Sequence, residues 1–288
     1  MSSFRDELTV KLSTVEDLPT LPSIIITLER LLHNEAVGME EVALVIEEDP
    51  AIAGSVLRVA NSVVYYSSLS GTIVSVRDAI VRLGFQEVGR VVSTAAFIRT
   101  FGTLGAHLDP GRFWRHSLTT AVAARVIGRS TTAPVSFYEE EAYTAGLLHD
   151  VGLLILGQYF PDAYDRVQTT MGKQGLAAAD AERAVLGLDH GEIGGYLLDR
   201  WNLPEVLVEA VTWHNQPDRA KPEAQLPAEV VRVSEIVSEA LEAGDDSEEI
   251  MQPVLGQGLW GTLGISPEGV AAVVDETRSQ STPVFALV

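Results

Sequence analysis

The chain contains no cysteine among its 288 residues. Disulfide bonds and thiolate metal sites are therefore excluded. Any metal ion that the protein binds must be held by imidazole and carboxylate groups, a ligand set that suits divalent transition ions. The six histidines are therefore the residues to follow along the chain.

Basic residues are scarce relative to acidic ones. The sequence has 20 lysines and arginines against 40 aspartates and glutamates, which gives a formal net charge of -20 and an isoelectric point of about 4.6. Such a field repels phosphate backbones and anionic lipid headgroups, so nucleic acids and membranes are poor partners for the surface as a whole. A local basic pocket remains compatible with this charge.

Long apolar runs are also absent. No stretch reaches the roughly 18 uninterrupted apolar residues of a membrane span, and the charged opening MSSFRDELTVKL is unlike a signal peptide. These absences predict a cytoplasmic protein. The length of 288 residues and the hydrophobic share of 46% allow one large domain or two modest lobes that share an interface.

The sequence lacks the alternating pattern and hairpin turns of strands, and helical periodicity dominates it instead. In the N-terminal part, Asp49 and Pro50 form a strong helix start, and Ser75 with Asp78 forms a start that resembles a capping box. Gly84 suits the end of the second of these helices. The predicted fold class is therefore all-α. The predicted N-terminal helices cover residues 23–34, 51–61, 75–84 and 86–100.

A break in the helical pattern at residues 101–111 carries three glycines and one proline, and it predicts a boundary between two helical lobes. The first lobe is expected over residues 1–105, the second over 112–243, and a C-terminal helical extension over 244–288. The predicted helices of the second lobe and the extension cover residues 113–128, 139–160, 175–186, 190–201, 205–214, 228–243 and 266–279. The tail after the last helix is expected to be irregular.

His149 and Asp150 stand inside the run AGLLHDVGLLIL, which is apolar nearly all the way round a helix and is therefore predicted to be buried. A buried His and a buried Asp each cost several kcal/mol unless they are paired, hydrogen-bonded or bound to a cation. On spacing alone two explanations stay open: the pair joins neighbouring helices by hydrogen bonds, or it binds a divalent transition metal ion together with other histidines. The histidines on predicted helices of the second lobe are His116, His190 and His214, whereas the less suitable His33 and His107 lie in the first lobe.

The run GLLHDVG (146–152) resembles the signature of the HD superfamily of metal-dependent phosphohydrolases. The succession FWRHS, GLLHDVG, LDHGEIGGYLLDRWNLP and TWHNQP resembles the HD-related output domain (HDOD) in particular, as do LPTLPSI, IEEDPAIAGSVLRVANSVVY and SVRDAIVRLG in the N-terminal part. The resemblance covers roughly residues 15–243, and its order and density make it far more specific than the His-Asp dipeptide alone. It implies an all-helical fold with an HD-domain-like C-terminal lobe, and a role in bacterial signal transduction as an output or scaffolding module.

Carried over residue by residue, the resemblance implies a metal site in the second lobe. The implied ligands are His116, His149, Asp150, His190, His214 and Glu235. The bound ion would be a divalent transition metal such as iron, manganese, zinc or nickel. Asp150 would be the catalytic group if the protein is an active hydrolase.

Three positions depart from the pattern of the HD phosphodiesterases. Their last ligand is normally the Asp of an Ala-Asp pair, but this chain has Ser234-Glu235, whose carboxylate lies one methylene further out and can still coordinate a metal ion. Leu153 stands where those enzymes usually carry a Lys suited to the phosphate. Asn215 follows His214 in TWHNQP, where the doubled His of the cyclic-dinucleotide phosphodiesterases is absent.

Two functions are compatible with this combination. We expect an output or scaffold module for signal transduction that keeps an HD-type metal pocket and is not catalytic, with a separate signalling protein or a small regulatory ligand as its partner. The alternative is a metal-dependent phosphohydrolase or phosphodiesterase that acts on a nucleotide or another phosphoester through a metal-activated water. Leu153, Asn215 and Glu235 favour the first function. For the second function, an arginine such as Arg115 or Arg232, both close in sequence to implied ligands, could compensate for the missing lysine.

Other residues near the histidines have simpler structural explanations. Trp114, Trp201 and Trp213 occur at helical spacing, which is more typical of core residues than of ligand stacking. Asp189 suits the N-cap of the helix that His190 begins.

Overall fold

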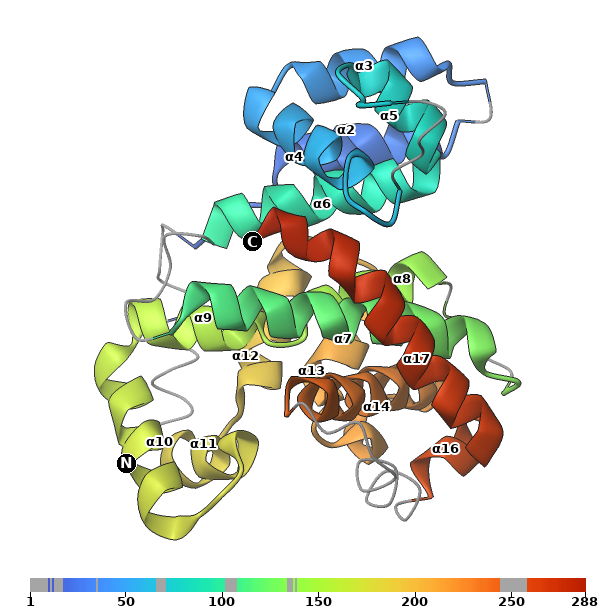
Figure 1. Cartoon of the computed structure of the whole chain (residues 1–288). Coiled ribbons are helices and arrows are strands. Elements are labelled where there is room, and N and C mark those ends of the chain that lie inside the picture. Colours follow the sequence, from blue (N-terminus) through green and yellow to red (C-terminus); the bar gives the residue numbers. More distant parts are fainter. Residues whose placement is uncertain are drawn as a thin grey trace. The chain divides into compact units, whose positions relative to one another are not determined.

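The computed structural model of the protein (Figure 1) describes residues 10, 12, 18–34, 36–65, 71–101, 108–133, 137, 139–243 and 258–288. Within these residues the regular structure is helical and there is no strand, which confirms the predicted all-α fold class. The contacts divide the chain into two units. The smaller unit comprises residues 19–103 and 279–288, and the larger unit comprises residues 1–18 and 104–278.

The smaller unit contains the helices drawn in blue to blue-green in Figure 1, of which α6 contacts α2, α4 and α5. These helices are α2 (Ser23–Leu32), α3 (Met39–Glu47), α4 (Pro50–Ala60), α5 (Val76–Leu83) and α6 (Phe85–Phe101). Their core is largely aliphatic, with Leu28, Ile46, Val56 and Val92 almost fully buried. Apolar packing therefore accounts for most of the stability that this unit gains on folding.

Side-chain caps begin two of these helices where the sequence predicts them. Asp49 Oδ1 accepts a hydrogen bond from Ala51 N at 3.0 Å, with Pro50 in the first turn of α4. Ser75 Oγ accepts one from Asp78 N at 3.0 Å at the start of α5. These bonds satisfy backbone N–H groups that a helix start leaves without a partner.

Glycine and asparagine end the same two helices. Gly84 follows α5 with a φ of 82°, a conformation that favours glycine. Asn61 follows α4, and its side-chain amide forms two hydrogen bonds of 2.8 Å with the backbone of Ile73. Asn61 therefore joins the end of α4 to the segment that leads into α5.

The larger unit is built around α7, which packs against α8 and α14, while α12 packs against α9 and α13. Its helices are α7 (Pro110–Ser130), α8 (Glu139–Leu148), α9 (Val151–Tyr159), α10 (Pro161–Gln174), α11 (Ala178–Leu186), α12 (His190–Arg200), α13 (Glu205–Trp213), α14 (Gln225–Glu242), α16 (Leu259–Thr262) and α17 (Pro267–Val284), with the short 3-10 helices η1 (Pro217–Arg219) and η2 (Pro222–Ala224). From Ser279 onward α17 belongs to the smaller unit, which also holds η3 (Phe285–Leu287).

The predicted helix over residues 139–160 is wrong, because the chain breaks at His149 and Asp150 into α8 and α9. Two close approaches explain the break. A Cβ atom on Gly146 would lie 2.8 Å from the backbone of α7, and one on Gly152 would lie 1.9 Å from the carbonyl oxygen of His190. Each half therefore packs tightly against a different helix, α8 against α7 and α9 against α12.

Other expectations need smaller corrections. Helices α3 and α10 were not predicted, and α7 begins at Pro110, three residues before the predicted start at 113. The tail expected to be irregular is helical: α17 runs to Val284 and η3 follows it. Within the predicted break and the predicted extension, residues 102–107 and 244–257 lie outside the described residues. Of that extension, residues 258–278 group with the larger unit and 279–288 with the smaller.

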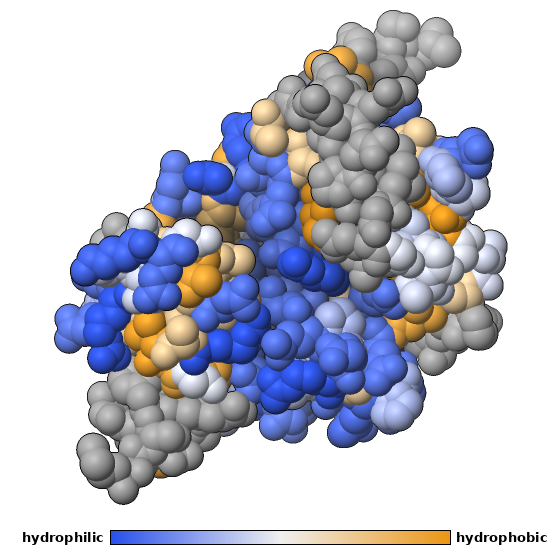
Figure 2. Space-filling model, turned by 90° about the horizontal axis from the view of Figure 1, so that it is seen from below, coloured by the Kyte–Doolittle hydropathy of each residue, from blue (hydrophilic) through white to orange (hydrophobic). Residues whose placement is uncertain are grey.

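The two units differ in charge and in exposed apolar side chains. The smaller unit has nine acidic and six basic residues, against 31 and 14 in the larger. The large hydrophobic residues exposed within the described part are Val10 in the larger unit and Ile26, Leu44, Val63, Val64, Val74, Val81, Phe85 and Val288 in the smaller. Figure 2 shows a face whose centre is covered by hydrophilic side chains, with hydrophobic ones scattered toward its edges. None of the described helices combines the length and the apolar character needed to span a membrane.

Candidate metal centre

Four histidines and one aspartate of the larger unit come together. His116 lies on α7, His149 and Asp150 at the break between α8 and α9, His190 at the start of α12, and His214 directly after α13. Asp150 Oδ2 lies 3.4 Å from His149 Nε2 and 3.7 Å from His116 Nε2, and Asp150 Oδ1 lies 3.1 Å from His190 Nε2. His190 Nε2 in turn lies 3.2 Å from His214 Nε2. We call these five residues the histidine cluster.

Two imidazoles of the histidine cluster are fixed by backbone carbonyls. His149 Nδ1 lies 2.8 Å from Gly146 O, and His214 Nδ1 lies 2.7 Å from Val211 O. Because a carbonyl oxygen only accepts hydrogen bonds, both Nδ1 atoms act as donors. In the neutral rings the Nε2 atoms therefore keep their lone pairs.

Carboxylates fix the other two imidazoles. Glu182 is buried, and its Oε2 accepts hydrogen bonds from both His190 Nδ1 at 2.8 Å and His190 N at 2.7 Å. Glu242 Oε1 accepts a hydrogen bond from His116 Nδ1 at 2.9 Å. A carboxylate behind an imidazole orients the ring and makes Nε2 a better metal ligand.

Polar atoms inside the histidine cluster lack hydrogen-bond partners. Within the part of the chain that the structure describes, this holds for the buried atoms His149 Nε2 and Asp150 Oδ1, although the latter lies 3.1 Å from His190 Nε2. A buried polar atom without a partner costs about 1–3 kcal/mol. A divalent cation that accepts their lone pairs would remove this cost, so the donor set fits a metal ion.

The ligand atoms form two groups of three that share Asp150. His116, His149 and Asp150 make one group, and Asp150, His190 and His214 make the other; within each group the ligand atoms lie within 4.8 Å of one another. We refer to them as the first and the second half of the histidine cluster.

Charge is distributed unevenly over the histidine cluster. Burial opposes protonation of His116, but its hydrogen bond to Glu242 and the charge of Asp150 outweigh burial and raise its pKa to about 9. Glu182 and Asp150 likewise outweigh burial and raise the pKa of His190 well above its usual value. For His214 burial prevails and lowers the pKa to about 4. Two imidazoles thus favour positive charge beside Asp150, the position where a cation would neutralise that carboxylate.

The predicted ligand Glu235 lies outside both halves of the histidine cluster. It stands on α14 with a buried side chain, and its Oε2 lies 2.9 Å from Arg232 Nη1. Its negative charge still acts on the histidine cluster, where it opposes the lowering of the His214 pKa by burial. Ligation by Glu235 therefore stays a prediction, and the contact in the structure is an ion pair.

Three residues beside the imidazoles were not predicted as part of the site: Glu182, Asn215 and Glu242. Asn215 Nδ2 lies 3.1 Å from His190 Nε2 and 2.9 Å from His214 Nε2. Its position next to His214 in the sequence was the available signal. Glu182 and Glu242 reach their histidines from other helices, so no local pattern identifies them.

The remaining candidates stand apart from the histidine cluster. His33 is exposed in the smaller unit, where its ring is hydrogen-bonded to Glu29 O, and His107 lies outside the described residues. Asp189 caps α12 in a full capping box with Glu192. Trp213 packs against a small alanine core and beneath the Arg219 guanidinium.

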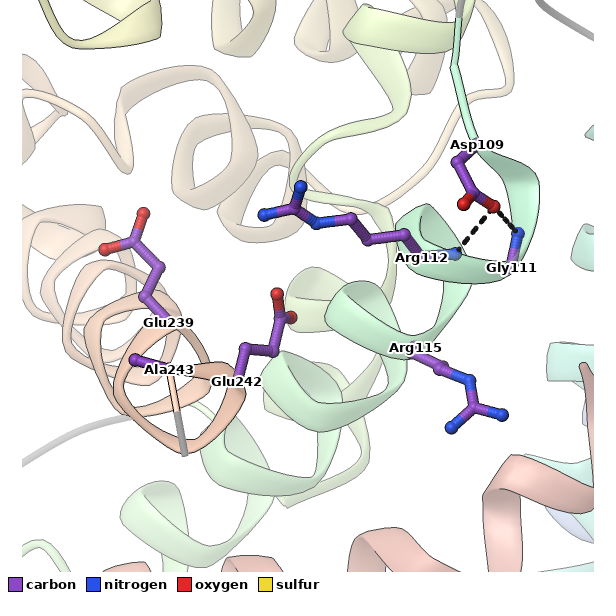
Figure 3. A pocket seen from close by; sticks show the side chains of 7 residues that line it. All are labelled: Asp109, Gly111, Arg112, Arg115, Glu239, Glu242 and Ala243. Carbon is purple, nitrogen blue, oxygen red and sulfur yellow. Dashed lines mark hydrogen bonds between the residues drawn. The ribbon is translucent and has the colours of Figure 1, made fainter. Parts of the chain in front are cut away.

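A pocket of about 660 Å³ is lined in part by Glu242, whose Oε1 also accepts the hydrogen bond from His116 Nδ1. Its lining residues are Asp109, Gly111, Arg112, Arg115, Glu239, Glu242 and Ala243. Figure 3 shows the Arg112 side chain reaching toward α14, whereas Arg115 points the other way. The lining therefore carries both signs of charge.

Solved structures similar to this chain share its fold. An HDOD domain protein of unknown function from Geobacter sulfurreducens is 24% identical, with 99% of this chain and 97% of that one covered and a TM-score of 0.81. A candidate phosphohydrolase from Shewanella amazonensis SB2B is 24% identical, with 96% of this chain and 97% of that one covered and a TM-score of 0.77. The MmoQ response regulator from Methylococcus capsulatus is 26% identical, with 90% of this chain and 98% of that one covered and a TM-score of 0.50.

Sequence comparison places the chain within a family. An uncharacterized protein of Treponema pallidum is 21% identical over 212 residues, which is 72% of this chain, and this chain spans 40% of the length of that relative. The sequence pattern of the HDOD domain matches residues 18–217, more than half of the chain. That match takes in α2 to α6 and all five residues of the histidine cluster, and on this ground the chain belongs to the HDOD domain family.

Proposed function

We propose that this HDOD protein is an output or scaffold module of bacterial signal transduction that binds a divalent transition metal ion in the histidine cluster and does not hydrolyse phosphoesters. The observation that carries the metal site is the fixed orientation of four imidazoles. Each Nδ1 atom is held by a carbonyl or a carboxylate, so each neutral ring would present its Nε2 lone pair to the interior of the histidine cluster. Ligands held in this way lose little entropy when an ion binds.

The residues that would hold the ion come from α7, the break between α8 and α9, the start of α12 and the position directly after α13. His116, His149, Asp150, His190 and His214 are the proposed ligands, and iron, manganese, zinc and nickel all suit imidazole with carboxylate. A bound ion would supply a Lewis acid beside Asp150. Since the ligands lie on different helices, binding would also stabilise the larger unit.

The charges around the histidine cluster argue against hydrolysis. Phosphoryl transfer needs positioned cations that stabilise charge on the phosphate oxygens. Leu153 stands where the HD phosphodiesterases carry a Lys, and Arg232 is paired with the buried Glu235. Arg115 is exposed, and Glu242 places another carboxylate at His116. A phosphoester would therefore meet a site in which carboxylates outweigh available cations.

The exposed apolar side chains of the smaller unit and the pocket between α7 and α14 are the surfaces that would suit a signalling partner. The likeness to the MmoQ response regulator supports a signalling role, and the exposed apolar side chains of the smaller unit would suit a separate signalling protein. The pocket between α7 and α14 would suit a small regulatory ligand that carries both signs of charge, because Arg112 and Glu239 both line it.

Metal analysis tests the first part of the proposal. Protein purified without chelator or metal-affinity tag should contain a divalent transition ion by inductively coupled plasma mass spectrometry, and Asp150→Ala should contain none. Asp199→Ala is the matched control, since Asp199 lies exposed on α12 and outside the histidine cluster. Wild-type protein that stays free of metal after incubation with manganese, iron, zinc or nickel would contradict the proposal.

Turnover measurements test the second part against the alternative, a metal-dependent phosphohydrolase. The complete set of five imidazole and carboxylate groups favours that alternative, as does the likeness to the Shewanella protein. Steady-state hydrolysis of cyclic dinucleotides and of a chromogenic phosphoester, with manganese or iron supplied, should not exceed the rate of Asp150→Ala. Metal-dependent turnover that disappears in Asp150→Ala would establish the hydrolase instead.

A further inference from the structure

We infer that the Asn215 side chain prevents a metal ion from binding at the second half of the histidine cluster. The chain therefore holds one metal ion, at His116, His149 and Asp150. This inference rests on the proposed metal binding and adds to it the number and the place of the ions. The two halves share Asp150 and contain the same kinds of ligand atom. Their difference lies in what already contacts the imidazole nitrogens.

In the second half, one amide nitrogen contacts both imidazoles. Asn215 Nδ2 lies 2.9 Å from His214 Nε2 and 3.1 Å from His190 Nε2, while the two Nε2 atoms are 3.2 Å apart. An amide nitrogen carries two N–H groups, so it can donate one hydrogen bond to each ring. Val211 O fixes His214 Nδ1 as a donor and Glu182 fixes His190 Nδ1 as a donor, so in the neutral form of each ring Nε2 can accept.

A metal ion and the Asn215 amide would compete for the same lone pairs. An imidazole nitrogen has one lone pair, in the plane of the ring. A metal ion would lie about 2.1 Å from Nε2 along that direction, and a donor nitrogen lies about 3 Å away along the same direction. The two positions overlap, so an ion can bind His190 and His214 together only after the Asn215 side chain has moved away.

In the first half, the lone pair of His149 Nε2 is not occupied by a hydrogen-bond donor among the described residues. Among the residues that the structure describes, no donor reaches His149 Nε2, which is fully buried. His116 Nε2 lies 3.7 Å from Asp150 Oδ2. An ion that enters here displaces no hydrogen bond of His149 Nε2, and it gains a carboxylate oxygen of Asp150.

The turn after α13 holds Asn215 in place. His214 before it is fully buried, and Gln216 N donates a hydrogen bond to Trp213 O at 2.8 Å. The Arg219 guanidinium stacks 4.0 Å from the centre of the Trp213 ring. These contacts restrict the backbone on both sides of Asn215, and moving its side chain would break its contacts with the two rings.

Manganese titration of the full chain tests the inference. The metal-free protein is loaded with Mn²⁺, passed through a desalting column and analysed for bound manganese, and the electron paramagnetic resonance spectrum distinguishes isolated ions from a coupled pair. We expect one isolated ion per chain for the wild type. Asn215→Ala should bind two, with the spectrum of a coupled pair. The nearly isosteric Asn215→Asp should also bind two, because its carboxylate supplies a further ligand in place of a donor.

Single ligand substitutions locate the ion. His149→Gln should lower manganese affinity at least tenfold, whereas His214→Gln should keep the single ion. The double variant Asn215→Ala/His214→Gln should return from two ions to one. Circular dichroism and the thermal midpoint establish that each variant is folded, and a variant that is not folded is replaced by its partner, Asn215→Asp for Asn215→Ala.

The outcomes separate this inference from the proposed function. Wild-type protein that binds no manganese overturns the metal site itself. Two ions in the wild type, or a single ion in both Asn215 variants, overturns the role of Asn215 while metal binding stands. Loss of the ion in His214→Gln but not in His149→Gln assigns the ion to the second half and likewise overturns the inference.

Discussion

Both units of this protein bury aliphatic side chains, but among the described residues the buried histidines lie in the larger unit. The smaller unit packs aliphatic side chains such as Leu28, Ile46 and Val56, and it leaves eight large hydrophobic residues exposed. The larger unit encloses the histidine cluster, and among its described residues the exposed large hydrophobic is Val10. Apolar packing is satisfied by contact alone, whereas a buried histidine cluster needs each polar atom paired. Changes at the histidine cluster should therefore act on the larger unit.

The largest effect is expected for Gly152→Ala in the larger unit. The added Cβ would lie 1.9 Å from His190 O and 2.8 Å from the carbonyl carbon, so the backbones of α9 and α12 must separate. We expect a loss of more than about 4 kcal/mol in the free energy of unfolding, beyond ordinary overpacking. The matched control is Gly172→Ala, also within a helix but with nothing within 4 Å of the new atom. It should stabilise the protein by about 0.5–1 kcal/mol. Equal effects in urea unfolding would contradict the packing described for α9.

A core truncation in the smaller unit should leave the metal site intact. Leu28 is 1% exposed, so Leu28→Ala should cost about 3 kcal/mol through lost burial and a new cavity. Bound metal per folded chain should remain that of the wild type, because every ligand belongs to the larger unit. Metal loss in folded Leu28→Ala would contradict this expectation, because it would show that a destabilised smaller unit impairs the metal site of the larger unit.

Metal removal should lower the stability of the larger unit, which contains the proposed ligands. At a free metal concentration 100 times the dissociation constant, binding contributes about 2.7 kcal/mol to the free energy of unfolding. Adding a chelator should therefore lower the thermal midpoint of the wild type. Asp150→Ala, which lacks the shared ligand of both halves, should show no such shift. A chelator effect that persists in Asp150→Ala would place the ion elsewhere.

The smallest effect is expected on the exposed face of the smaller unit. Val81 on α5 is 69% exposed, so Val81→Ser should change the free energy of unfolding by less than about 0.5 kcal/mol. The neighbouring Ile80 is 3% exposed, and Ile80→Ser should cost several times more, since it buries a hydroxyl and leaves a cavity. Similar values for the two variants in urea unfolding would mean that Val81 is covered in solution.

Local signals in the sequence were sufficient for several helix boundaries. Asp49 and Ser75 cap their helices as predicted, since a side-chain cap depends on residues within one turn. Asp109 and Pro110 carry the same signal at the start of α7, but they were assigned to the break between the lobes. The break at His149 could not be found by periodicity, because α8 and α9 are both apolar on most faces.

In the candidate site, too, some residues could be predicted from the sequence and others could not. A buried His-Asp pair requires partners. Three histidines on predicted helices of the second lobe were candidates by position, the resemblance implied the same three, and the structure brings them to Asp150. The groups that orient the imidazoles depend on tertiary packing: Glu182 reaches His190 from α11. Asn215 was noticed as a departure, but its contact with two rings follows from the position of α13 beside α12.

The path of the chain between the units has a consequence for synthesis. Residues 279–288 belong to the smaller unit, where Arg58 Nε donates a hydrogen bond to Ala286 O at 3.2 Å and Val284 is buried. The ribosome makes residues 104–278 between the two parts of that unit. A nascent chain therefore carries residues 19–103 without their closing segment until the whole larger unit has been translated. The contacts of this segment with α4 can therefore form only after that interval.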